Sequence, residues 1–207
     1  MASPEYERFR RSFLDDSSAS ITQGLDVRSL TALQGEERAH AEGLLIARLD
    51  GVGDPRAVTG LDALRSERAR PGFERLYEAT RGHALESSGL KLVMVSVALW
   101  HLAPDPKWLD AVLDVLRHSP IAAIRRAAAE ALAEFDHPDA REALIEALDA
   151  SDMMVRHAAA KSLLTMHGVA FDTNNNRHAI YRVMSPDAAT RSAAKHEVVA
   201  LISATSA

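Results

Sequence analysis

Residues 124–132 read IRRAAAEAL, and residues 155–163 return to the same pattern as VRHAAAKSL. Corresponding positions are 31 residues apart throughout, as Arg125 and Arg156 show. A period of this length is typical of helical solenoids, in which each repeat packs only on its neighbours. The pattern therefore predicts an all-α solenoid of stacked antiparallel helix pairs. Solenoids mostly bind other macromolecules, so binding is a stronger expectation than catalysis.

The composition fits closely packed helices. Hydrophobic residues make up 47% of the 207 residues but aromatic residues only 5%, so alanine and leucine supply most of the packing. Both have high helix propensity, and alanine lets neighbouring helices approach closely. The chain is long enough to bury a sizeable core as one continuous stack.

Charge and cysteine content exclude several classes of protein. A formal charge of −5 and a pI near 6.0 argue against a nucleic-acid binder, which needs a basic surface for phosphate contacts. The absence of cysteine excludes disulfides and thiolate zinc sites and fits a reducing cytoplasm. The acidic N-terminus is unlike a signal peptide, and no apolar run reaches the roughly 20 residues that cross a bilayer. We therefore expect a cytoplasmic protein with no membrane partner.

Proline and aspartate mark the expected start of the first helix in each pair. Asp54-Pro55, Asp105-Pro106 and Asp136-His137-Pro138 each offer an aspartate as the helix cap and a proline for the first turn. First helices are expected over 54–65, 105–117 and 137–149, and second helices over 71–80, 88–102, 121–134 and 152–167. Further helices are expected over 34–49, 177–184 and 186–203.

The ends of the predicted stack are irregular. Ser3 precedes Pro4 as a helix cap, and Tyr6, Phe9 and Phe13 form an aromatic stripe that would cover the open end of the stack. Within a single domain over 1–207 we expect an N-terminal cap at 1–30, degenerate repeats at 31–102, the clearest repeats at 103–168 and a C-terminal cap at 169–207.

One stretch of the repeat resembles a known family. His137-Pro138-Asp139-Ala140, Leu144, Leu148, Asp152 and the 155–163 helix are similar to bacterial HEAT-like repeats, including those of phycobiliprotein lyases. The resemblance is strongest over 103–164 and absent from the first thirty and last thirty-five residues. It implies a ladder between turn aspartates and helix arginines, which gives Asp152, Arg156 and Arg125 structural roles.

A second resemblance concerns the N-terminal half. Residues 30–39 read LTALQGEERA, and residues 53–57 read GDPRA. With Glu42 and the 44–46 segment, these residues are similar to small bacterial HEAT-repeat proteins that are often encoded beside polymorphic or secreted toxins. This resemblance implies an immunity protein whose partner is a toxin.

The second helices are expected to line the concave side and to carry the contact surface. Spacings of four place their polar residues on one ridge per helix, and stacking sets the ridges about 10 Å apart. An adjacent turn adds methionines, whose flexible side chains suit adaptable contacts. The candidate partner-binding residues are Arg126, Glu130, Glu134, Met153, Met154, His157 and Lys161.

Other functions fit the sequence less well. An adaptor or assembly factor would have the same fold with a resident partner. A HEAT-fold enzyme would be a phycobiliprotein chromophore lyase or an alkylpurine DNA glycosylase, and the glycosylase could use Trp100, Trp108 and Asp105.

No cofactor or metal is expected. The histidines lack the spacing of zinc ligands, although Glu36, Glu37 and His40 could share a helix face. The Asp172-x-Asn174-x-Asn176 pattern departs from a calcium loop, because its sixth and twelfth positions are Arg177 and Val183.

Overall fold

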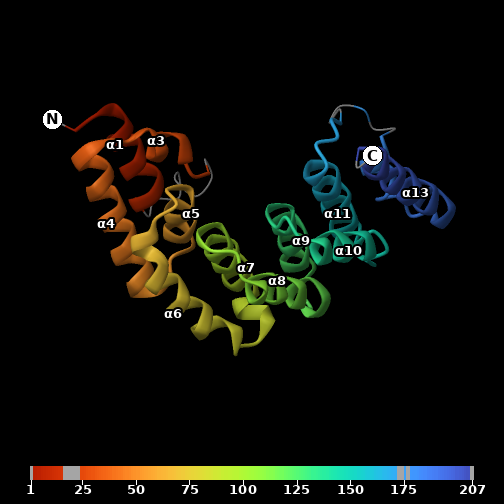
Figure 1. Ribbon diagram of the computed structural model, residues 1–207, viewed down its shortest axis with the longest axis horizontal. Coiled ribbons are helices and arrows are strands. Elements are labelled where there is room, and N and C mark those ends of the chain that lie inside the picture. Colours follow the sequence, from red (N-terminus) through yellow and green to blue (C-terminus); the bar gives the residue numbers. More distant parts are fainter. Residues whose placement is uncertain (1, 16–23, 172–174, 176–177, 206–207) are drawn as a thin grey trace. The chain divides into compact units, whose positions relative to one another are not determined.

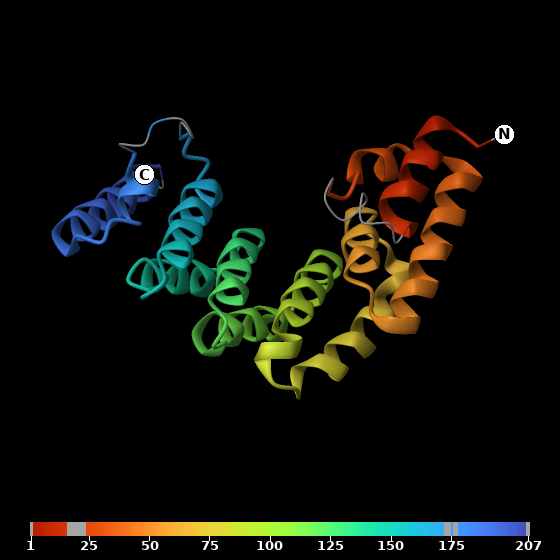
Figure 2. The same ribbon diagram turned by 180° about the vertical axis from the view of Figure 1, so that it is seen from behind.

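The computed structural model describes residues 2–15, 24–171, 175 and 178–205, and every regular element within these ranges is helical. The predicted all-α class is therefore confirmed. The chain divides into two compact units, Met1–Thr80 with Met94–Pro104 and Arg81–Val93 with Asp105–Ala207 (Figures 1 and 2). Asp172, Asn174, Asn176 and Arg177 of the calcium-like pattern lie outside the described residues.

The first unit is built around aromatic and leucine side chains. Phe9, Phe13 and Phe73 are fully buried, and Leu30 and Leu45 pack in the same core. Two residues of the aromatic stripe, Phe9 and Phe13, thus lie inside this unit, whereas Tyr6 is half-buried. The elements of this unit are α1 (Pro4–Phe9), the π-helical η1 (Arg10–Leu14), α3 (Val27–Ala32), α4 (Gly35–Val52), α5 (Pro55–Ala63), the 3-10 helix η2 (Glu67–Ala69) and α6 (Arg70–Arg81).

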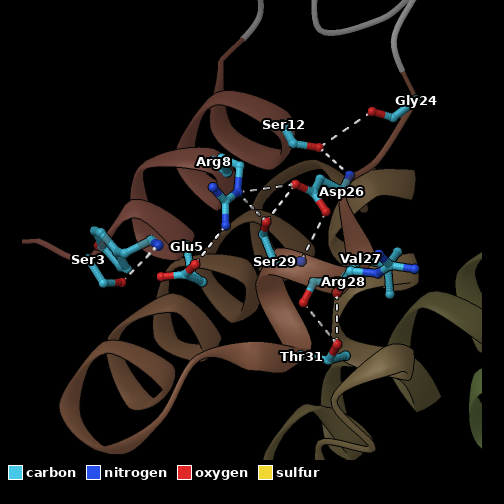
Figure 3. A network of polar contacts seen from close by, with 11 residues as sticks. Ser3, Glu5, Arg8, Ser12, Gly24, Asp26, Val27, Arg28, Ser29 and Thr31 are labelled. Carbon is cyan, nitrogen blue, oxygen red and sulfur yellow. Dashed lines mark hydrogen bonds and ion pairs between the residues drawn. The ribbon is translucent and has the colours of Figure 1, made fainter.

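The short helix α3 was not predicted from the sequence. Its start is stabilised by Asp26, which accepts hydrogen bonds from the backbone and the hydroxyl of Ser29 (Figure 3). These bonds lower the pKa of Asp26. Arg8 of α1 donates to the Ser29 hydroxyl at 2.9 Å and to Glu5 at 2.7 Å (Figure 3). The network joins α1 to α3 through polar contacts. Such contacts do not produce a hydrophobic period in the sequence, which is the main signal for predicting a helix.

The second unit contains the clearest repeats. Ala128, Ala129, Ala158 and Ala159 are buried, which lets α9 and α11 pack closely side by side (Figure 1). Helices α8 and α10 form the other layer and contact these partners, as stacked helix pairs do. The elements are α7 (Leu85–Leu102), which both units share, α8 (Pro106–His118), α9 (Ala122–Ala131), the 3-10 helix η3 (Leu132–Glu134), α10 (Pro138–Ala147), α11 (Met153–Met166), α12 (Ala179–Arg182) and α13 (Ala188–Ala204).

The predicted helix starts are mostly confirmed, with one correction. Asp54 and Asp105 cap α5 and α8 through their side chains, each with a proline following. At α10 the cap is His137, whose Nδ1 accepts from the Asp139 backbone at 3.2 Å, and Asp136 does not cap this helix. The first turn of α10 begins one residue later than the Asp-Pro pattern implied, so the intervening histidine takes the capping position.

Among the described residues no ion pair joins Asp152 to Arg156 or Arg125, so the structure does not show the expected ladder, although the arginines are structural. Asp152 caps α11 by accepting from the backbone of Met154 and Val155. Arg156 instead donates to four main-chain carbonyls, and Arg125 donates to the carbonyl of Ser119. Carbonyls at the ends of the first helices and in the turns need donors, and arginine supplies several from one side chain.

The repeat geometry continues beyond residues 103–164, where the resemblance to HEAT-like repeats is strongest. Helix α13 packs on α11 and α12, and its Arg191 donates to the carbonyls of Ser185 and Pro186, as Arg156 does to the turn before α11. The predicted C-terminal cap therefore contains a shortened helix pair. Among the described helices, none is both long and apolar enough to span a bilayer.

Candidate protein-interaction face

The face formed by α9 and α11 carries the residues that the sequence singled out. Arg126 and Glu130 are exposed and pair across one turn of α9, with Nε 3.7 Å from Oε1. An exposed pair of this kind stabilises the protein by only about 0–1 kcal/mol. Both side chains are therefore available to a partner at little cost in stability.

His157 is the least exposed polar residue of this face. Its ring lies 5.6 Å from the ring of Tyr181 at an interplanar angle of 33°. Burial lowers the pKa of His157 below its ordinary value near 6.5, the charge of Lys161 lowers it further, and Glu130 opposes both. The net lowering favours the neutral form of His157. The effect of the Glu130 charge on His157 is consistent with the contact between α9 and α11.

The remaining candidates lie around this centre. Lys161 is exposed on α11, Met153 is 51% exposed at its first turn, and Met154 is half-buried. Glu134 is exposed but belongs to the 3-10 helix η3. Because a 3-10 helix has three residues per turn, the ridge through Arg126 and Glu130 does not run straight on to Glu134.

Tyr181 was missed by the sequence analysis. It lies on α12, a helix of four residues in a segment where the repeat pattern had been lost. A single aromatic residue there carries no periodic signal. Only the return of α12 and α13 onto α11 places Tyr181 beside His157.

Three of the residues considered for catalysis or metal binding, Glu37, Asp105 and Trp108, have structural partners. Glu37 accepts from both the backbone and the hydroxyl of Ser3, at 2.7 and 2.6 Å. Asp105 caps α8, which lowers its pKa, and Trp108 is buried beneath the ammonium of Lys107. Within the described part of the chain, no group of three or more histidine and acidic side chains is arranged to hold a metal ion.

Comparison with known proteins agrees with this architecture. A family model described as HEAT repeats matches residues 102–174, which include α8 to α11. Searches of curated proteins and of solved structures find no match to the chain. The matched region contains all of the predicted contact residues.

Proposed function

We propose that this HEAT-like repeat protein is a non-enzymatic scaffold that binds a protein partner through the face of α9 and α11. HEAT repeats generally mediate protein interactions. The observation that carries the proposal is the combination on one face of exposed charges of both signs, an exposed methionine and a half-buried histidine. A surface with adaptable apolar contacts ringed by charges suits a protein partner.

The specific form of the proposal is an immunity protein whose partner is a bacterial toxin in the cytoplasm. Its support is the resemblance of residues 30–39 and 53–57 to HEAT-repeat proteins encoded beside toxins. The scaffold would block the toxin active site sterically, and complementary charge would speed their encounter. A net charge of −5 would suit a basic toxin such as a nuclease.

The absence of catalysis is part of the same proposal. A glycosylase would require Trp108 and Asp105 to face a flipped base, but one is buried and the other caps a helix. The acidic chain also offers no excess of cations for a DNA backbone.

The test combines capture of a partner with a matched pair of charge reversals. The tagged chain and its Glu130→Lys and Glu142→Lys variants are used to capture protein from the native lysate, and each captured protein is expressed alone to measure toxicity. Both glutamates are exposed in the second unit, but Glu142 lies on α10 in the opposite layer. We expect a toxic partner that the parent chain and Glu142→Lys neutralise and that Glu130→Lys fails to capture.

Two other results would change the conclusion. A resident, non-toxic partner lost in Glu130→Lys would support the scaffold and favour an adaptor or assembly factor. A partner retained equally by both variants would contradict the α9–α11 face as the binding surface.

A further inference from the structure

Three arginines occupy equivalent places in successive second helices and use one nitrogen in the same way. Nη1 of each donates to a carbonyl six residues earlier, in the turn that precedes its helix. This bond fixes each guanidinium against its own repeat and leaves the Nε–Nη2 edge for a neighbour. The bonds join Arg125 to Ser119 at 2.6 Å, Arg156 to Ala150 at 2.7 Å and Arg191 to Ser185 at 3.1 Å.

At Arg156 the Nε–Nη2 edge is occupied by the next helix pair. Nε donates to the carbonyl of Val183 at 2.6 Å, and Nη2 reaches the carbonyl of Met184 at 3.5 Å. Arg156 is only 6% exposed as a result. Two oxygen acceptors at the end of α12 therefore fill this edge and close the junction between the pairs.

Arg125 lines a pocket, and no described carbonyl accepts a hydrogen bond from its Nε–Nη2 edge. Within the described part of the chain, the only hydrogen bond of this side chain is the one from Nη1 to Ser119. The pocket has a volume of about 460 Å³, within the range of about 300–1,000 Å³ that is usual for ligand sites. Buried apolar side chains from the ends of α8 and α10 and from the start of α11 contribute to its lining, namely Leu116, Ala143, Ala147 and Val155.

The other charged residues that line this pocket are already paired. Arg117 lies 3.4 Å from Glu146 across the rim, and Asp149 pairs with Lys195 of α13. Among the charged residues described in the lining, Arg125 is thus the one without an oppositely charged partner. Charge complementarity favours an occupant that brings a negative charge and two oxygen acceptors.

We propose that the pocket beside Arg125 binds a glutamate side chain of a protein partner. The carboxylate would accept from Nε and Nη2, a bidentate geometry that arginine and carboxylates favour, and thus replace the two carbonyls found at Arg156. The methylene groups would pack on the apolar part of the lining. Successive residues of an α-helix are about 100° apart, so Arg125 and Arg126 leave α9 in different directions. The lining of the pocket contains none of the residues of the face proposed above.

The test is an NMR titration of the whole chain with two blocked peptides, acetyl-Ala-Leu-Glu-Leu-Ala-amide and its glutamine counterpart. Blocked ends exclude binding through a terminal carboxylate. The glutamate peptide should shift the amide signals of Ala150 and Ser151 and the Nε signal of Arg125 in a saturable manner, and the glutamine peptide should bind about tenfold more weakly. Absence of saturable shifts at millimolar peptide, or equal binding of both peptides, would overturn the proposal.

Three variants locate the binding. Arg125→Gln should abolish the shifts, whereas Arg126→Gln, at the neighbouring position about 100° around α9, should retain them. Ala150→Leu narrows the pocket without removing Arg125, and should also abolish binding while the Arg125 Nε signal persists. If the amide spectrum of Arg125→Gln loses its dispersion, the variant is unfolded and the test rests on Ala150→Leu. Unchanged peptide binding by Ala150→Leu would refute the site.

Discussion

In the first unit, phenylalanines from α1, η1 and α6 are buried at positions that follow no 31-residue period, and polar contacts join α1 to α3. In α8 to α11, small alanines repeat at fixed spacing and one arginine per helix pair holds the turn before it. A few large side chains concentrate packing energy, whereas repeats distribute it over equivalent interfaces. Single substitutions should therefore have larger and more local effects in the first unit than in the repeats.

The largest effect should come from Phe13→Ala. Phe13 is fully buried, and truncating such a phenylalanine costs about 3–5 kcal/mol of unfolding free energy because it leaves a cavity. Hydrogen exchange should accelerate in α4 and α5 and stay unchanged in α11. Equal acceleration of hydrogen exchange in α11 would show that the effect of the substitution is not confined to the first unit.

Within the repeats, the largest effect should come from Arg156→Met. The variant keeps an apolar stem but leaves the carbonyls of Ala150 and Val183 without their charged donor, which should cost about 1.5–3 kcal/mol in urea denaturation. Arg125→Met is the matched control and should cost less, since only one bond is lost. Equal losses would contradict the difference between the two junctions.

A smaller effect is expected from close packing at Gly60. A Cβ there would lie 2.9 Å from atoms of both Leu45 and Phe13, so Gly60→Ala should destabilise the first unit by about 1–3 kcal/mol. Gly43 lies in the interior of α4 with open space around its Cβ position, and Gly43→Ala should stabilise by about 0.5–1 kcal/mol. Thermal melts should shift in opposite directions, and shifts of the same sign would disprove the packing argument.

The starts of α9 and α11 are equivalent positions with different capping residues. Asp152 caps α11, and Asp152→Ala should cost about 1 kcal/mol. Ile121 occupies the cap of α9 without a side-chain hydrogen bond, so Ile121→Asp should stabilise by about 0.5–1 kcal/mol. A destabilising Ile121→Asp would mean that the exposed isoleucine contributes more by packing than a cap would.

The smallest effect concerns the titration of His157. Lys161→Met should raise its pKa toward 6.5 and Glu130→Gln should lower it further, which NMR titration of the ring can follow. Because folding lowers this pKa, the associated stability is present above about pH 6.5 and is lost as the pH falls through the lowered value. An unchanged pKa of His157 in Glu130→Gln would contradict the proximity of Glu130 on α9 to His157 on α11.

Much of the fold could be predicted because helix signals are local. Caps such as Asp54 and Asp105 and the alanine pattern of α9 and α11 act within a few residues, so their spacing marks the helices directly. Helix α3 escaped prediction because it has only six residues and because Arg8, which donates to its Ser29, comes from a different helix. The Asp26 cap is a local signal but a weak one alone. His137 took the cap from Asp136 because the choice between adjacent residues depends on backbone geometry.

The candidate face was predicted in part for the same reason. Four-residue spacing placed Arg126 beside Glu130, and the repeat period placed Glu130 near His157. No local signal in the sequence indicated that α9 is followed by the 3-10 helix η3, which contains Glu134. None indicated that Tyr181 packs against His157.

The sequence by itself determined that residues 103–168 form paired helices with a 31-residue period, because helix propensity, capping and periodicity are properties of neighbouring residues. Only the tertiary structure decided what each equivalent residue contacts. Arg125 and Arg156 are identical in type and place, yet one lines a pocket and the other is buried against Val183 and Met184. The physical reason is that a guanidinium edge is satisfied by whichever oxygen atoms packing brings to it, and packing depends on the whole neighbouring pair.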